Sequence, residues 1–330
     1  MHSSGGVLMR YSKGLTLIEL MVALVIGLII IAAAFQLFLT GSINYNLQKN
    51  LAELQDNGNF GLNYLIKDIK LANLDADLAI INDRNQYSGI VLTSSKSYAS
   101  LAEEDKKVQS ANLPLYLTNS SVELSQLTRA KVGPSNVNVA SDQLVIQYKA
   151  FDPQGFDCEG NAITQDEINE GLFIVQRYFL RTDGKNTDLA LACDAGRYKT
   201  LVPTDNLPGG INGLGGNGQI VMRRVDYFHV LLGVKQNNSD EFSYMTIDQY
   251  MGSTNSLVKD AAPRARIMSI QLGALVRGFD SVAGNEVMPT EFRVLNQNVE
   301  LDGSLTEKYV RDVVSQTVAL RNGYGLMEEL

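Results

Sequence analysis

The 330-residue chain is poor in the side chains on which most enzymes and metal sites depend. It has two histidines, His2 and His229, and two cysteines, Cys158 and Cys193. A structural zinc site usually needs four Cys or His ligands at short spacings, and the cysteines lack both neighbouring histidines and the C-x-x-C spacing of a redox pair. A Ser-His-Asp arrangement would have to use His229, which lies in a strand-like segment where a structural role is the simpler interpretation. The sequence therefore favours a protein that is not an enzyme.

Basic residues are also in short supply. Lys and Arg number 28 against 36 Asp and Glu, a formal net charge of −8. Surfaces that bind nucleic acid normally need clustered Lys and Arg, so we expect no nucleic-acid partner. The chain is 45% hydrophobic and only 19% charged, which is enough apolar material for a substantial core in one large domain or two small ones.

Charge is absent from one long stretch, with a single exception. Residues 15–39 form an apolar run whose only ionisable side chain is Glu19. About 20 apolar residues cross a bilayer as a helix, so this run is long enough to span. Arg10 and Lys13 precede it without any acid, which places the N-terminus in the cytoplasm by the positive-inside rule. A carboxylate inside hydrocarbon is expensive, so Glu19 requires a pairing or functional role.

The residues around Glu19 resemble the class III signal of type IV prepilins. In that resemblance residues 1–14 are the leader peptide, the scissile bond is Gly14–Leu15, and Glu19 is the fifth residue of the mature chain, within the segment TLIEL. The family most often begins with phenylalanine where this chain has Leu15. The resemblance implies cleavage and N-methylation of Leu15 by a prepilin peptidase. Cleavage would leave 26 basic against 36 acidic residues, a formal charge of −10.

Two simpler interpretations of the same segment remain. A Sec signal peptide also has a basic start and an apolar centre, and residues 32–34 (AAA) imitate its cleavage site, but the apolar character continues through Leu39. An uncleaved membrane anchor fits everything except Glu19 and the Gly14 that precedes it.

A helical pattern continues beyond the apolar run. Apolar residues and one glycine recur every three or four positions, as on one stripe of a helix: Ile43, Leu47, Leu51, Leu54, Gly58, Leu62, Leu65 and Ile69. The sequence therefore predicts one helix over 15–71, with a transmembrane part at 15–39 and an amphipathic part at 40–71. Each glycine in a helix costs up to about 1 kcal/mol relative to alanine, so we expect bends at some of Gly27, Gly41, Gly58 and Gly61.

The remainder, 72–330, is predicted to be a β-rich globular domain outside the cytoplasm. Segments rich in β-branched and aromatic residues predict strands at 144–151, 172–181, 189–193, 219–234, 242–250, 267–276 and 316–320. Residues 183–186 and 236–240 predict hairpin loops. The fold class is α+β, with the long N-terminal helix packed on a mainly antiparallel sheet. Disulfides persist outside the cytoplasm, so we expect Cys158 to pair with Cys193.

Three later segments narrow the resemblance. Residues 59–70 (NFGLNYLIKDIK), 264–277 (RARIMSIQLGALVR) and 317–322 (TVALRN) are similar to the PilW family of minor pilins. That similarity implies a type IV pilin-like fold and a role in priming pilus assembly within a tip complex. The implied partners are other minor pilins, the major pilin, a pilus tip protein, prepilin peptidase, the inner-membrane assembly platform and membrane lipid.

The same resemblance implies a location and a role for Glu19. The chain would be a single-pass inner-membrane protein with a periplasmic domain that later reaches the pilus tip or cell surface. The carboxylate of Glu19 would neutralise the α-amino group of a neighbouring subunit and set the stagger between helices. A J-type pseudopilin of type II secretion and a membrane-anchored extracytoplasmic binding protein are the alternatives.

Two motifs suggest ligands on spacing alone. The glycines at 213, 215 and 218 match the dinucleotide fingerprint in letters, but they follow a Pro- and Gly-rich loop and lead into a strand-like segment, so we expect only a loop. Asp157, Glu159 and Asn161 have the first, third and fifth spacing of a calcium-binding EF-hand, without its glycine at position six or its glutamate at position twelve. We therefore favour a solvated acidic face over a calcium ion, and expect no cofactor.

Overall fold

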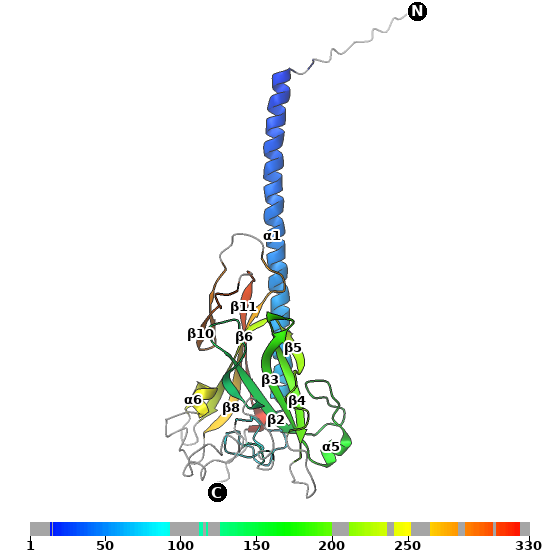
Figure 1. The fold of residues 1–330 in the computed structure, drawn as a ribbon, viewed down its shortest axis with the longest axis vertical. Coiled ribbons are helices and arrows are strands. Elements are labelled where there is room, and N and C mark those ends of the chain that lie inside the picture. Colours follow the sequence, from blue (N-terminus) through cyan, green and yellow to red (C-terminus); the bar gives the residue numbers. More distant parts are fainter. Residues whose placement is uncertain are drawn as a thin grey trace, which may run out of the picture. The chain divides into compact units, whose positions relative to one another are not determined.

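The computed structural model describes residue 14 and residues 16–92, 112–114, 117, 126–199, 211–235, 241–251, 265–282, 288–305 and 308–323. The chain divides into two compact units, Met1–Lys49 and Asn50–Leu330. A single helix, α1, spans Leu17–Ile69 and contributes to both units (Figure 1). Every strand belongs to the second unit.

The described part of the first unit is mainly the apolar portion of α1. Its hydrophobic side chains are exposed; Leu17, for example, is 79% exposed and Phe38 is 71% exposed. The most apolar 18-residue window of α1 has a mean hydropathy of 2.8 and contains no buried residue. By length and composition this helix is sufficient to cross a membrane.

From Asn50 onwards, α1 buries one face. The buried residues are Asn50, Leu54, Gly58, Gly61, Leu62, Leu65, Asp68 and Ile69. The predicted stripe is confirmed from Leu54 to Ile69, whereas Ile43 at its start is 38% exposed. The buried face also includes two polar residues, Asn50 and Asp68, that the pattern of apolar residues did not predict.

Two glycines allow this face of α1 to approach the strands closely. A Cβ atom added to Gly58 would lie 2.8 Å from Cγ1 of Val314, and one added to Gly61 would lie 2.7 Å from Cβ of Met222. Both distances are shorter than van der Waals contact. Helix α1 continues through all four of its glycines, so none of them interrupts the helix. At Gly58 and Gly61 the missing side chain serves packing.

Two asparagines, Asn73 and Asn322, lie where the chain leaves helix α1 after Ile69. Asn73 adopts a left-handed conformation with φ 65°, which asparagine tolerates better than most residues. Asn322 lies near the other end of the chain, and its Nδ2 donates to the carbonyl oxygens of Lys70 and Ala72, each at 3.1 Å. Both carbonyls belong to the turn that follows the last helical residue, Ile69, so these bonds satisfy the backbone where the helix ends. The segment that contains Asn322 is thereby tied to α1.

Three antiparallel sheets make up the rest of the second unit. The five-stranded sheet has the order β1 (Arg129–Gly133), β2 (Ser141–Lys149), β3 (Phe173–Asp183), β4 (Lys185–Tyr198) and β5 (Gln219–Arg223). The four-stranded sheet has the order β11 (Arg311–Ala319), β8 (Arg266–Arg277), β6 (Val225–Lys235) and β7 (Phe242–Thr246). A hairpin of β9 (Glu291–Val294) and β10 (Gln297–Glu300) forms the third, and short helices α5 (Gln165–Asn169), α6 (Ile247–Met251) and η2 (Arg321–Gly323) complete the described elements.

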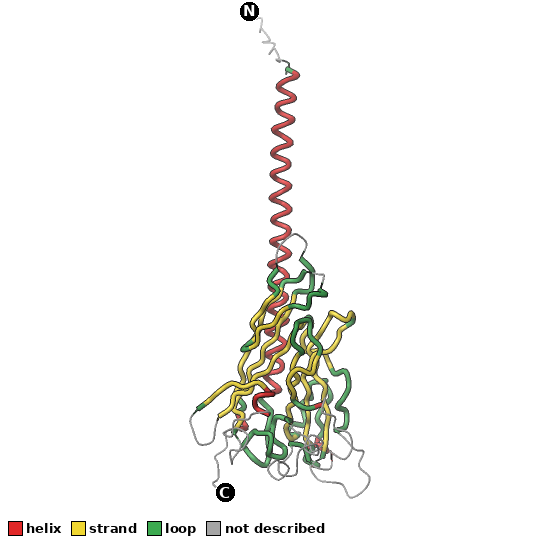
Figure 2. Tube along the Cα trace, turned by 60° about the vertical axis from the view of Figure 1, so that its left-hand side comes forward, coloured by secondary structure: helices red, strands yellow, loops and turns green. Residues whose placement is uncertain are grey.

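The largest core cluster joins the buried face of α1 to both larger sheets. It contains Leu144, Tyr178 and Leu191 from the five-stranded sheet, together with Phe228, Leu272 and Val314 from the four-stranded sheet. Figure 2 shows strands on either side of the carboxy-terminal part of α1. The α+β class and the antiparallel pairing predicted from the sequence are confirmed.

Two of the predicted strands are divided in the structure. The strand expected over 219–234 is two strands in different sheets, because Arg224 between β5 and β6 adopts φ 58° and turns the chain. The strand expected over 242–250 ends at Thr246, where α6 begins.

The remaining differences concern short elements. Strands β1, β9 and β10 have only four or five residues each and were not predicted. The hairpin loop expected over 183–186 is shorter than predicted, since β3 ends at Asp183, β4 begins at Lys185, and Gly184 with φ 88° makes the turn. The loop expected over 236–240 lies outside the described residues.

Buried charges connect strands of both sheets. The fully buried Asp226 on β6 accepts a hydrogen bond from Nε of Arg311 at 2.7 Å, and its other oxygen lies 3.2 Å from Nε of Arg277. Nη2 of Arg277 donates to Asp188 of β4 at 2.6 Å, and Arg224 also pairs with Asp188. Each carboxylate thus faces two guanidinium groups. Removing one partner from such a cluster would leave a buried charge uncompensated.

We predict that Gly61→Ala destabilises the second unit although alanine is the better helix former. Crowding against Cβ of Met222 should cost about 1–3 kcal/mol and outweigh a propensity gain of about 1 kcal/mol. Thermal unfolding of the detergent-solubilised chain measures the difference. Gly41→Ala is the control, because a Cβ there meets no atom within 4 Å. Equal melting temperatures for the two variants would show that the close approach at Gly61 is not needed.

Candidate functional site

The amino-terminal end of α1 contains the residues that the sequence singles out for processing and assembly. Gly14 is exposed, and no atom lies within 4 Å of the position that a Cβ would take. Leu15 lies outside the described residues. Because α1 begins at Leu17, the predicted scissile bond precedes the helix.

Thr16 and Glu19 close the first turn of α1 with reciprocal hydrogen bonds. The backbone N–H of Glu19 donates to Oγ1 of Thr16 at 3.3 Å, and the backbone N–H of Thr16 donates to Oε2 of Glu19 at 2.9 Å. This is a capping box, which satisfies amide groups that have no partner within the helix. Its signature, Thr-x-x-Glu, is present in the sequence, but our interpretation of the sequence assigned Glu19 only to contacts between subunits.

The capping box leaves part of the Glu19 carboxylate open. The hydroxyl of Thr16 also donates to Oε2 at 3.0 Å, whereas Oε1 accepts no hydrogen bond from any residue that the structure describes. Nor does any basic side chain in the described ranges form an ion pair with Glu19. The carboxylate is therefore held in place by its own helix while one oxygen remains available to a donor from outside the chain.

The second pair of predicted site residues, Cys158 and Cys193, forms a disulfide with Cα atoms 6.0 Å apart. Both residues are buried, and the bond joins the loop before α5 to strand β4. The hydroxyl of Tyr64 on α1 donates to the carbonyl of Cys158 at 3.2 Å. The disulfide thus attaches the loop before α5 to the five-stranded sheet.

The acidic segment around this disulfide is folded onto β4. Asp157 is only 3% exposed and pairs with Nη1 of Arg197 at 2.8 Å, so the prediction of a solvated face is wrong at this residue. Glu167 pairs with Nε of Arg197 at 2.7 Å, and Glu159 accepts from the N–H of Ala195 at 3.1 Å. Among the described residues, no group of three or more His, Cys, Asp and Glu side chains is arranged to hold a metal ion.

Two segments considered for enzymatic chemistry have structural roles. His229 is buried on β6; its Nδ1 lies 2.6 Å from Asp142 on β2, and its Nε2 lies 2.9 Å from Asn296 in the β9–β10 turn. The glycine motif is a loop that leads into β5, as predicted. The amides of Gly215 and Gly216, which a phosphate would need, donate instead to Asp194 at 2.8 and 3.2 Å.

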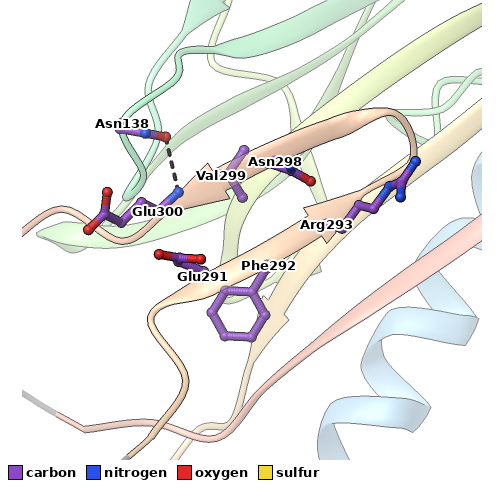
Figure 3. A pocket seen from close by; sticks show the side chains of 7 residues that line it. All are labelled: Asn138, Glu291, Phe292, Arg293, Asn298, Val299 and Glu300. Atoms are coloured by element: carbon purple, nitrogen blue, oxygen red, sulfur yellow. Dashed lines mark hydrogen bonds between the residues drawn. The ribbon is translucent and has the colours of Figure 1, made fainter.

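A hollow of about 410 Å³ lies beside the β9–β10 hairpin (Figure 3). Glu291 and Glu300 are directly opposite each other across the two strands, and the side chain of Asn138 accepts a hydrogen bond from the N–H of Glu300 at 3.1 Å. Like charges in opposed positions weaken a strand pair. The hairpin must therefore be held by other contacts, which include burial of Val294 and Val299.

Comparisons with known proteins match two parts of the chain. Residues 177–322 match the family model "Type IV Pilus-assembly protein W", and residues 9–35 match "Prokaryotic N-terminal methylation motif". The solved structure of a type IV-like pilin, TTHA1219 from Thermus thermophilus, shares 15% identity with this chain at a TM-score of 0.29. The matched region covers 58% of this chain and 81% of that one. A comparison with curated proteins found no match.

An apolar N-terminal helix that carries a methylation motif and continues into an antiparallel β domain defines a type IV pilin-like protein. The match over 177–322 covers β6, β8, β11 and the buried Arg277–Asp226–Arg311 cluster. Together with the methylation motif, this match supports a type IV pilus minor pilin of the PilW family.

We predict that removing the disulfide lowers the free energy of unfolding of the second unit by about 3–4 kcal/mol. The bond joins residues 35 positions apart in the sequence and so restricts the unfolded chain. The double variant Cys158→Ala/Cys193→Ala should melt roughly 10 °C below the oxidised chain. A reductant should bring the wild-type chain to the same melting temperature and leave the variant unchanged. If the reduced and oxidised chains have the same melting temperature, the ion pairs of Arg197 suffice to hold this loop.

Proposed function

We infer that this minor pilin helps to prime type IV pilus assembly and to form the tip complex, and that it acts through its N-terminal helix. The observation that carries this inference is the state of Glu19, whose carboxylate is fixed by Thr16 with one oxygen open. An acid at the start of a helix whose apolar segment has no buried residue is costly in lipid unless a partner neutralises it.

The mechanism begins with removal of the leader. Hydrolysis of the Gly14–Leu15 bond by prepilin peptidase would create an α-amino group at Leu15, which the same peptidase would then methylate. That amine on one subunit and Glu19 on the next are opposite charges in a low-dielectric medium. Their pairing compensates both charges, and it sets the axial register between helices because only one stagger brings the two groups together.

The proposed location follows from the same elements. Arg10 and Lys13 favour a cytoplasmic N-terminus, and the Cys158–Cys193 disulfide suits an oxidising compartment. The second unit would then stand in the periplasm and later at the pilus tip or cell surface. Its partners would be the inner-membrane assembly platform, the major pilin, a tip protein and other minor pilins.

A series of substitutions at Glu19 separates the cap from the intersubunit charge. Glutamine also completes a capping box, so Glu19→Gln keeps the helix start and removes only the charge. We expect Glu19→Gln and Glu19→Leu to be cleaved and inserted normally, yet to lose most of their incorporation into sheared pili and most of their co-purification with other minor pilins. Full incorporation of Glu19→Gln would mean that the cap, and not the charge, is what assembly requires.

Processing is tested independently by mass spectrometry of the membrane-extracted chain. The wild-type chain should lack residues 1–14 and carry a methyl group on Leu15. Gly14→Val should retain all 14 leader residues, because a β-branched side chain replaces the glycine at the cleavage position. An intact leader on the wild-type chain in piliated cells would contradict the proposed assembly step.

A further inference from the structure

Asp68 is a buried carboxylate at the contact between α1 and the five-stranded sheet. It is 8% exposed, and its Oδ2 lies 2.8 Å from the hydroxyl of Tyr178, which has no exposed surface. The same hydroxyl lies 3.1 Å from Oε1 of Gln176, whose Nε2 donates to the hydroxyl of Tyr148 at 3.2 Å. These four side chains form a continuous polar chain inside an apolar core.

The number of protons in this chain favours a neutral Asp68. The Tyr178 hydroxyl has one proton and faces two acceptors, Asp68 Oδ2 and Gln176 Oε1, so an ionised Asp68 leaves one contact without a proton. A protonated Asp68 donates to Tyr178, which then donates to Gln176, and every contact is satisfied. An ionised Asp68 receives a proton from Tyr178 only if the amide of Gln176 is flipped. Nε2 of Gln176 would then donate to the Tyr178 hydroxyl, and that hydroxyl would donate to Asp68.

The surroundings of Asp68 act in the same direction. Burial raises the pKa of Asp68 to about 6; the Tyr178 hydrogen bond and the charge of Lys67 oppose this rise, and the charge of Asp157 adds to it. The titratable groups around Asp68 are Tyr178 and Tyr148 from the sheet, Tyr64 and Lys67 from α1, and Asp157 from the loop before α5.

His229 is a second buried group placed to retain a proton. Both of its ring nitrogens face acceptors, Oδ2 of Asp142 and Oδ1 of Asn296, so the doubly protonated ring donates at both. Asp142 acts as an acceptor throughout, since it also accepts from the backbone N–H groups of Val230 and Lys131. Burial by itself lowers the pKa of His229, but the hydrogen bond and charge of Asp142 and the contact with Asn296 outweigh burial and raise it; the Lys131 charge opposes them. The ring of Tyr227 stacks on His229 without a charge.

Each proton lies at the contact between a sheet and another element, and one of these elements, the β9–β10 hairpin, is strained. Asp68 lies on α1, and Asn296 lies in the turn of the β9–β10 hairpin, which forms the walls of the hollow in Figure 3. That turn contains Leu295 at φ 56°, a strained conformation for a branched residue, and the strands beside it carry the opposed Glu291 and Glu300. A strained hairpin with internal repulsion depends on its anchors.

We propose that Asp68 and His229 are proton-binding switches that fasten α1 and the β9–β10 hairpin to the sheets in mildly acidic surroundings and loosen them as the pH rises. Both groups bind a proton more tightly in the folded than in the unfolded chain. Stability from Asp68 is therefore lost as the pH rises from about 4 to about 6, and stability from His229 is lost above about 6.5. Such a switch would regulate the hairpin surface and the seating of α1 independently of Glu19.

The first experiment measures the two protons directly in the leader-free chain, solubilised in detergent. That chain contains one histidine, so isotope-labelled histidine gives a single NMR signal that belongs to His229. Its titration midpoint should lie above 6.5, and the carboxyl carbon of Asp68, assigned by its absence in Asp68→Asn, should titrate near 6. A histidine midpoint at or below 6.5, or an Asp68 midpoint near 4, overturns the proposal for that group.

The second experiment measures the consequences. An asparagine side chain mimics the neutral acid, so Asp68→Asn should melt at least about 3 °C above wild type at pH 8 and level with it at pH 4. Hydrogen-exchange protection of residues 291–300, corrected for the intrinsic rate, should fall in wild type between pH 5.5 and 8 and be low at both in His229→Gln. Strand β3 is the internal control and should keep its protection. A difference between Asp68→Asn and wild type that does not change with pH, or a hairpin equally protected at both values, would refute the switch.

Discussion

Burial of one face of α1 between two sheets is the interaction on which the second unit depends. Leu54, Leu62, Leu65 and Ile69 have no exposed surface, and full burial of each contributes about 1.5–3 kcal/mol. Together these four side chains contribute on the order of 6–12 kcal/mol, as much as the net stability of an ordinary domain. The carboxy-terminal part of α1 is therefore a component of the core. Any event that loosens the helix there also exposes the inner faces of both sheets.

The long helix could be predicted because its signal repeats over many turns, whereas the short elements could not. Strands β9 and β10 have four residues each and are largely polar, so only their pairing and their burial against Tyr227 and Leu275 identify them as strands. The turn at Arg224 requires a positive φ from a residue that rarely adopts one, and no local pattern announces it. Both features are decided by tertiary contacts.

The same local signal, a capping box that begins with threonine, stands at the start of three helices. Helices α1, α5 and α6 each start with a threonine followed three residues later by Glu or Gln, and the two side chains bond each other's backbone amides: Thr16 and Glu19, Thr164 and Glu167, Thr246 and Gln249. At residue 246 this signature would have corrected the overlong strand prediction. A glutamine would serve the cap at Glu19 equally well. The cap therefore does not explain the carboxylate there, whereas the proposed contact between subunits does.

Buried polar groups mark the limit of prediction from the sequence. Asp68 interrupts the apolar stripe and is visible there, but Tyr178, its partner, is 110 residues away. His229 meets groups 87 and 67 residues away, and Arg311 meets Asp226 across 85. A buried donor or acceptor is tolerated only when it is satisfied, so each of these positions constrains a distant part of the chain. At Asp68 and His229 the buried group is satisfied by a proton that is exchanged with the solvent. The pH therefore becomes part of what holds the helix and the hairpin in place.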